Sequence, residues 1–229
     1  MTQIYSKLNY ILQTNILDTV IDYINHKNLV SYKREDAITA LSYISKYIHK
    51  DKINLLHEVL INIIKDEFTE LKKRYYEEEP FFIKTPHDYK ALKLNALTCL
   101  IQTGYKDYKY IFDNLNLILK DDLLESTYLP AVISLGKIGM ELNSKKYLNH
   151  ITNYLFHFAN SSDNNIVAHS IFYLSKIIRK NEVSNLQTFL FILMKMKDDP
   201  DSSLRWSVAK SCINLKTKIL KNPIINTLS

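Results

Sequence analysis

The stretch Ala131-Val132-Ile133-Ser134-Leu135 contains the pattern that decides the fold of this chain. A small residue is followed at once by an apolar residue, and a second apolar residue comes three positions later. The other copies are Ala96-Leu97-Leu100, Ser170-Ile171-Leu174, Ser211-Cys212-Leu215 and a fainter Ala40-Leu41-Ile44. The last residues of the four clear copies lie 35, 39 and 41 positions apart. Helical units with a period in this range are typical of a stacked α-solenoid.

The composition points the same way. The 229 residues include only three Gly and five Pro, which is poor in turn residues for a sandwich, a barrel or alternating strands and helices. We therefore predict an all-α chain that forms one right-handed solenoid of about ten to twelve helices.

Helical spacing and breaks divide the chain into segments. Residues 1–50 are expected to form capping helices, 51–76 a long helix, 77–86 an inserted loop, 87–219 the regular repeats, and 220–229 a tail. The loop is inferred because the step from Ile44 to Leu100 is 56 residues. Within the repeats, the predicted pairs are 91–104 with 107–119, 124–142 with 146–159, 164–180 with 183–197, and 202–219 with the tail. Gly104 should end the first of these helices, and Asp163 and Asp201 should cap later ones.

Residues 87–219 resemble the HEAT-like repeat superfamily. Ala131-Val132-Ile133-Ser134-Leu135-Gly136-Lys137-Ile138-Gly139 is similar to the helix-end phrase of the short HEAT variant in phycobilin lyases. Asp198-Asp199-Pro200-Asp201-Ser202-Ser203-Leu204-Arg205-Trp206 is similar to the acidic turn and first-helix opening of a HEAT repeat. The chain departs from the pattern at Pro130, which should kink its helix. The resemblance implies a stack whose second helices line a concave groove. Such proteins are mostly scaffolds for protein partners, some bind nucleic acid, and a few are enzymes.

The second helix of each pair has its own register, anchored on Leu60, Leu115, Leu155 and Leu190. Two positions before and five positions after each anchor are polar in every pair, and seven residues make two helical turns. These columns predict a protein-binding face, to which the inserted loop would add a phenylalanine pair, either as a contact or as a plug. The candidate partner-binding residues are Glu58, Phe81, Phe82, Asp113, Asn116, Asn153, His157, Thr188 and Lys195. The proposed occupant is a partner protein, and the role either an adaptor or a toxin-neutralising immunity protein.

The charge distribution leaves a second hypothesis open. The net charge is +6, and residues 171–229 carry 10 basic and 4 acidic residues, whereas residues 1–170 carry 20 of each. This basic end is either a solvated cap of the stack or a surface for nucleic acid. The residues that would contact nucleic acid are Lys176, Arg179, Lys180, Arg205 and Lys210. Trp206 stands among them, and we expect it to be a packing residue between repeats.

Catalytic signatures are weak throughout the sequence. There is no Gly-x-Ser-x-Gly elbow and no phosphate loop. Di-iron HEAT-like hydroxylases carry repeated His-Glu pairs, and this chain has only His57-Glu58. His150 and His157 share a helical face but stand two turns apart, about 10–11 Å, which is too far for one zinc ion. We expect no enzyme, no cofactor and no metal.

The remaining signals concern the compartment. Cys99 and Cys212 fall in helical patterns and are expected to be buried thiols of a reducing cytosol. The N-terminus does not resemble a signal peptide, and no stretch reaches about 18 apolar residues. We therefore expect a cytoplasmic protein that has no membrane partner.

Overall fold

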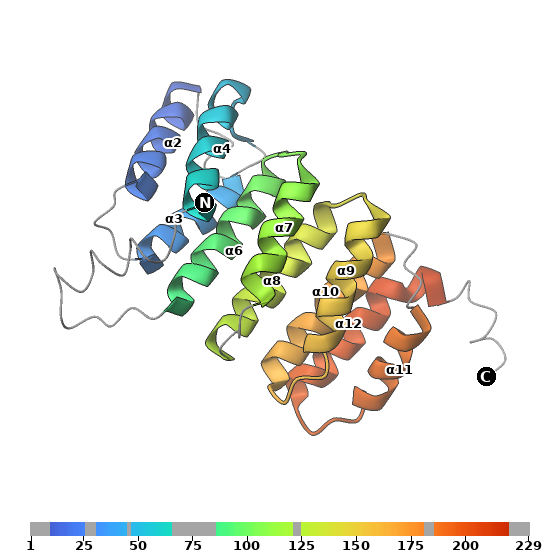
Figure 1. Ribbon diagram of the computed structural model, residues 1–229. Coiled ribbons are helices and arrows are strands. Elements are labelled where there is room, and N and C mark those ends of the chain that lie inside the picture. The colour runs from blue at the N-terminus through green and yellow to red at the C-terminus, as the bar shows by residue number, and fades with distance from the viewer. Residues whose placement is uncertain are drawn as a thin grey trace. The chain divides into compact units, whose positions relative to one another are not determined.

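The computed structural model describes residues 10–25, 31–44, 47–65, 86–120, 125–180 and 186–219 (Figure 1). These residues form helices and no strand, so the all-α prediction is confirmed for them. The helices are α2 (Tyr10–Asn25), α3 (Ser31–Ile44), α4 (Lys50–Lys65), α6 (Pro86–Gln102), α7 (Tyr108–Lys120), α8 (Glu125–Glu141), α9 (Lys145–Phe158), α10 (Asn164–Lys180), α11 (Leu186–Met196) and α12 (Ser202–Ile219).

The observed bounds from α7 onward follow the predicted helix pairs closely, and α10 and α12 match the predicted ranges 164–180 and 202–219. The last part of the predicted long helix, the inserted loop up to residue 85, and the tail lie outside the described residues. Pro86 belongs to α6 as its first residue, a position where its missing amide costs no helical hydrogen bond. No helix in the described ranges is long and apolar enough to span a bilayer.

The predicted caps are present in the structure. Asp163 Oδ1 accepts hydrogen bonds from the amides of Asn165 (2.7 Å) and Ile166 (3.4 Å) at the start of α10. Asp201 Oδ1 does the same for Ser203 (2.7 Å) and Leu204 (3.4 Å) at the start of α12. Gly104 has a φ of 88°, the left-handed conformation that ends α6.

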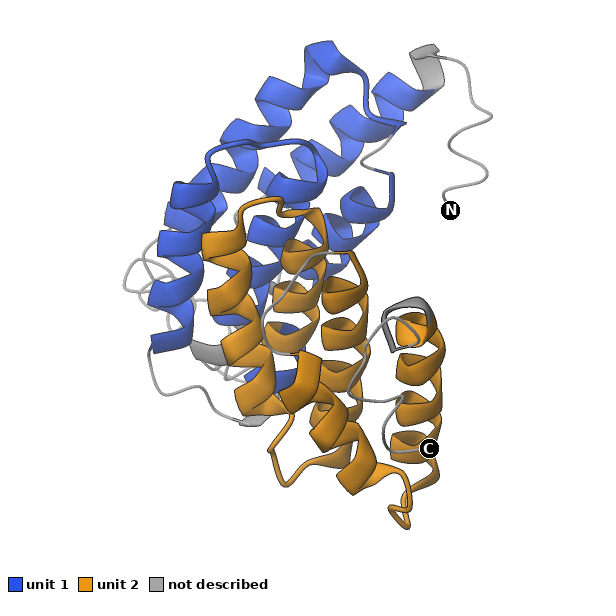
Figure 2. Ribbon diagram, turned by 90° about the vertical axis from the view of Figure 1, so that its right-hand side faces the viewer, with its two compact units in different colours: residues 1–130 blue, residues 131–229 orange. Residues whose placement is uncertain are grey.

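The chain divides into two compact units, residues 1–130 and 131–229 (Figure 2). The division falls directly after Pro130, which lies inside α8.

In unit 1, α6 is the central helix. It contacts α3, α4 and α7, and α2 contacts α3 and α4. α6 is buried on most of its circumference, from Leu92 to Ile101, as expected for a helix surrounded by others. Two polar links hold the outer helices: Arg34 Nε donates to the carbonyl of Ile24 at 2.9 Å, and Lys52 pairs with Asp18 at 3.0 Å.

In unit 2, α10 is the central helix. It packs mainly against α12 and also contacts α9 and α11. Three polar links join α10 to α12: Asn164 donates to Asp201 (2.9 Å), Ser211 to the carbonyl of Ile171 (3.4 Å), and Asn214 to Ser175 (3.0 Å). These hydrogen bonds lie near the start of both helices and again in their later turns. α10 and α12 therefore form one two-helix layer.

Glycines set the approach of α8 to α10. A Cβ placed on Gly136 would stand 2.0 Å from Cγ of Tyr173, and one on Gly139 would stand 2.5 Å from Cδ1 of Ile177. Both side chains therefore lie directly on the α8 backbone. The small residues of the phrase 131–139 thus have a packing role within unit 2.

The repeated pattern marks core positions, with one exception. Its residues in α6, α8 and α10 are buried, Ala40 is half-buried, and Ser211 and Leu215 in α12 are fully buried. Cys212 is exposed, so the expectation of a buried thiol there was wrong, whereas Cys99 is buried as expected. The residue of α10 that is equivalent to Cys212 is Ile171, which is covered because α12 packs on α10. Cys212 itself lies on α12, the last described helix.

Candidate functional site

The predicted partner-binding columns are at the surface of their helices. Glu58 on α4, Asp113 on α7, Asn153 and His157 on α9, and Thr188 and Lys195 on α11 are all exposed, and Asn116 is half-buried. Asp113 forms an ion pair with Lys109 at 2.7 Å. Unit 1 carries Glu58, Asp113 and Asn116, and unit 2 carries the other four. Phe81 and Phe82 lie outside the described residues.

The register predicted for α11 needs a correction. Leu190 was expected to be its core anchor, but Leu190 is half-buried and Phe189 is 0 % exposed. The ring of Phe189 meets Phe156 of α9 edge-on, with 6.3 Å between centroids. With Phe189 as the anchor, the positions two before and five after it hold Gln187 and Met194. Met194 and its neighbour Phe191 are 65 % and 71 % exposed, so the surface of α11 carries two large apolar side chains beside the predicted Thr188 and Lys195.

Four of the five basic candidates fall into two groups, and the fifth, Arg179, is exposed on α10. Arg205 donates to the carbonyls of Asp199 (2.7 Å) and Pro200 (2.8 Å), and Lys180 donates to the carbonyl of Met140, so these two bond to their own fold. Lys176 and Lys210 instead lie over aromatic rings. Lys176 Nζ is 4.2 Å from the centroid of Phe172, and Lys210 Nζ is 4.2 Å from Trp206 and 5.2 Å from Phe172.

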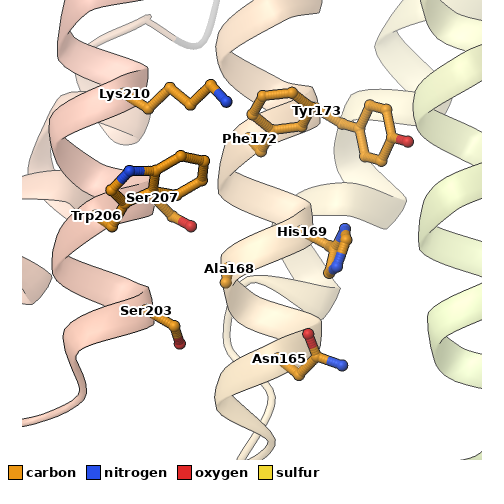
Figure 3. Close-up of a pocket in the computed structure, with 9 residues that line it drawn as sticks. All are labelled: Asn165, Ala168, His169, Phe172, Tyr173, Ser203, Trp206, Ser207 and Lys210. Atoms are coloured by element: carbon orange, nitrogen blue, oxygen red, sulfur yellow. The ribbon is translucent and has the colours of Figure 1, made fainter.

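A cavity of about 350 Å³ lies between α10 and α12 beside these lysines (Figure 3). Its aromatic walls are Phe172, Tyr173 and Trp206. The remaining lining residues are mostly polar: Asn165, Ala168, His169, Ser203, Ser207 and Lys210. Figure 3 shows Lys210 at one end of this group and Ser203 and Asn165 at the other.

Trp206 was expected to be a packing residue between repeats, and this expectation was wrong. The side chain is 60 % exposed and forms part of the cavity wall. Position 206 precedes the small residue of its repeat by five, and the equivalent residues are Asn165 in α10 and Ser126 in α8. Because neither equivalent is aromatic, the repeat itself does not require tryptophan there.

The sequence did contain a signal for this site. Phe172 precedes Lys176 by four residues, and Trp206 precedes Lys210 by four, so each helix places a cation beside an aromatic ring on one face. Two such pairs on neighbouring helices predict a combined aromatic and cationic surface. The interpretation of Trp206 as a packing residue between repeats did not take this pattern into account.

The electrostatics of the site are one-sided. α9, α10, α11 and α12 contain no Asp or Glu, and the described carboxylates between these helices are Asp163, Asp198, Asp199 and Asp201. The pKa of Lys176 is lowered by burial and then by the positive charges of Lys210 and Arg179. At the Ser203 end of the cavity, Asp201 accepts hydrogen bonds from Ser203 and Asn164, and these hydrogen bonds lower its pKa to about 2.

In unit 1, His57 has structural partners. Its Nε2 lies 2.9 Å from Oγ1 of Thr103, and its ring meets Tyr105 edge-on at 5.2 Å. Burial lowers the pKa of His57, and a hydrogen bond with the backbone of Thr103 acts in the opposite direction. Among the described residues, no three His, Cys, Asp or Glu side chains converge as metal ligands would.

Unit 2 thus presents two neighbouring features: the exposed apolar pair on α11, and the aromatic cavity with its lysines between α10 and α12. A comparison with known families, curated proteins and solved structures finds no match to this chain.

Proposed function

We propose that this protein is a non-enzymatic binding module that holds an acidic partner protein through unit 2. The observation that carries the proposal is the face of α11, where Phe191 and Met194 are 71 % and 65 % exposed. Large apolar side chains of this kind are enriched in the centres of protein interfaces, and methionine adapts its shape to a partner. Thr188 and Lys195 lie beside them on the same helix and supply the polar rim that interfaces have.

The acidic character of the partner follows from the charge of unit 2. Two cations in α9, three in α10, one in α11 and four in α12 stand on helices that carry no carboxylate. Complementary charge guides the encounter of two proteins and disfavours like-charged competitors. An adaptor and a toxin-neutralising immunity protein are both roles of this kind.

The proposed architecture is the HEAT-like right-handed solenoid. It is supported by the repeat period, by the all-helical structure, and by the packing of successive first helices α10 and α12. In such a stack the second helices, among them α9 and α11, would line the binding surface.

Affinity capture with the tagged full chain tests this function. The wild type should recover one acidic protein in stoichiometric amount, and that protein, once purified, should bind directly in a titration. The double variant Phe191→Ser, Met194→Ser should lose this binding, because the apolar centre of the interface is gone. Ile213→Ser is the matched control, since Ile213 is 73 % exposed on α12.

Charge variants refine the result. Lys195→Glu should weaken binding, and Asp113→Lys tests whether unit 1 also contacts the partner. Equal recovery by the double variant and by Ile213→Ser would rule out the α11 face, and a basic partner would contradict the charge argument.

A second candidate function is nucleic-acid binding by the basic face of unit 2. It is favoured by the same observation, that the helices α9, α10, α11 and α12 contain no Asp or Glu. Such binding should weaken steeply between about 50 and 200 mM salt. A protein that heparin does not retain would exclude it.

A further inference from the structure

The cavity between α10 and α12 combines aromatic walls, hydrogen-bonding side chains and cations in one place (Figure 3). Its volume of about 350 Å³ lies within the range of small-molecule sites, about 300–1,000 Å³. All of its lining residues belong to unit 2. It is therefore a defined site, distinct from the exposed face of α11.

The walls suit a flat ring. Phe172, Tyr173 and Trp206 line the space. Figure 3 shows Phe172 and Trp206 near each other, whereas Tyr173 points away from Trp206. Ala168 lines the space with a small side chain. The equivalent residue of α8, two positions before the small residue of its repeat, is Leu129. Stacking of a base on an aromatic side chain contributes about 1–3 kcal/mol and tolerates any base.

The polar side chains of the lining favour a nucleobase over an apolar side chain of a peptide as the ligand. Asn165, His169, Ser203 and Ser207 are among the lining residues, and their side chains carry hydrogen-bond donors and acceptors. The edge of a nucleobase can satisfy such groups, whereas a phenylalanine or leucine of a peptide would cover them without replacing their hydrogen bonds. The lining therefore favours a ring with polar edges.

The cations define where a negative charge would lie. Lys210 and Lys176 meet around Phe172, at 5.2 and 4.2 Å from its centroid, and Arg179 is close enough to affect the pKa of Lys176. The carboxylate of Asp201 stands at the opposite, Ser203 end. A phosphate is thus attracted to the lysine end, and the amino groups of a base to the other end.

We propose that this cavity binds a nucleobase together with its phosphate, from either a free mononucleotide or a single strand of nucleic acid. The site does not depend on the proposed partner protein. For the second candidate function, nucleic-acid binding, it specifies this cavity as the binding site in place of a general basic face.

Trp206 provides the assay, because it is the only tryptophan of the chain and it lines the cavity. Adenosine monophosphate and a short single-stranded oligodeoxyadenylate are titrated into the full-length protein while the tryptophan emission is recorded. A saturable change is expected with at least one of them. Inorganic phosphate alone should leave the emission unchanged, because it cannot stack.

Three variants locate the binding. Lys210→Gln should weaken it about tenfold, because one charge-assisted contact is lost. Lys216→Gln removes the same charge from an exposed position on the same helix and should change the affinity less than about twofold. Ala168→Leu places the residue of the equivalent α8 position into the cavity and should abolish the saturable change.

The outcomes separate the sources and the alternatives. Equal affinities for the two probes indicate a free nucleotide, and tighter, salt-sensitive binding of the oligonucleotide indicates a single strand. No saturable change with either probe overturns the proposal. Equal weakening by Lys210→Gln and Lys216→Gln overturns it in favour of a diffuse basic surface, and a response only to an acidic aromatic peptide overturns it in favour of a protein segment. If Ala168→Leu lowers the melting temperature, the comparison of the two lysine variants decides.

Discussion

Gly136→Ala should destabilise unit 2, although alanine is the better helix former. The added Cβ would stand 2.0, 2.2 and 2.5 Å from Cγ, Cδ1 and Cδ2 of Tyr173. Carbon atoms in contact normally lie about 3.5–4.0 Å apart, so α8 and α10 would have to separate by about 1.5 Å. The ring cannot turn aside, because Cγ is fixed next to the backbone and Tyr173 is only 8 % exposed.

The magnitude follows from two opposing terms. Overpacking of a core costs about 1–3 kcal/mol, and an overlap this deep against the root of a ring belongs to the upper part of that range, about 2–3 kcal/mol. Replacement of a helical glycine by alanine returns about 1 kcal/mol through helix propensity. The net loss should be about 1–2 kcal/mol, or about 2–8 °C in Tm for a chain of this size.

Gly139→Ala is the matched control on the same helix. Its Cβ would stand 2.5 Å from Cδ1 of Ile177, the far end of a flexible side chain, with the next contact, Cγ2 of Ile151, at 3.1 Å. Rotation of Ile177 can relieve most of this overlap, so the gain in helix propensity should nearly cancel the cost. The double variant Gly136→Ala, Tyr173→Ala should be more stable than the sum of its single changes predicts, because removal of the ring makes room.

Unfolding is followed by circular dichroism for the whole chain and by the emission of Trp206 for unit 2. The two signals together show whether the units unfold in one transition, which any free energy from the data requires. A Gly136→Ala protein as stable as the wild type would refute the direct contact between Tyr173 and α8. A larger loss for Gly139→Ala than for Gly136→Ala would refute the distinction between ring root and flexible end.

Three further predictions concern single ionisable groups. The pKa of Asp201 is lowered from 3.8 to about 2 in the folded state, so its stabilising effect should be complete above pH 3.8 and disappear as the pH falls through about 2. Melting curves of wild type and Asp201→Asn should therefore differ at neutral pH and converge in acid; a constant difference would contradict the cap. Burial lowers the folded-state pKa of His57, so unfolding should become easier as the pH falls below 6.5, and His57→Gln should lose that part of the dependence. In a native thiol titration, the exposed Cys212 should react well before the buried Cys99, and more slowly than a free thiol because partial burial raises its pKa. Cys212→Ser should remove the fast phase, and a fast phase that persists would place Cys99 at the surface.

Much of the fold could be predicted from the sequence because the helical signals are local. The bounds of α10 and α12 follow from spacing and from the capping residues Asp163 and Asp201. Each of these carboxylates accepts a hydrogen bond from the amide two residues later in the chain. Burial of the repeated small and apolar residues is also local in origin, since it depends on one face of one helix. The failures occurred where burial depends on what lies beyond the helix: Cys212 has the pattern of a core residue and is exposed on the last described helix.

The register of α11 failed for a different reason. Leu190 and Phe189 are adjacent and both apolar, so spacing alone does not distinguish which one faces the core. In the structure Phe189 is fully buried and its ring meets that of Phe156 in α9, whereas Leu190 is half-buried. A shift of one residue rotates a helix face by about 100°, so the two predicted columns move from Thr188 and Lys195 to Gln187 and Met194. Met194 lies on the exposed surface together with Phe191. A contact between side chains far apart in sequence therefore decides which residues a partner would meet.

The repeat also helps to separate structural residues from candidate functional ones. A residue that packing requires should recur in the equivalent position of neighbouring pairs, as the small and apolar residues of the pattern do. Lys210 is matched by His169 in α10 and by Pro130 in α8, and Trp206 by Asn165 and Ser126, so neither is required by the stack. An exposed tryptophan with a lysine over its ring also exposes apolar surface that a purely structural position would not need to expose. Departure from the repeat, together with exposure and convergence on one cavity, is therefore the physical reason to seek a ligand between α10 and α12.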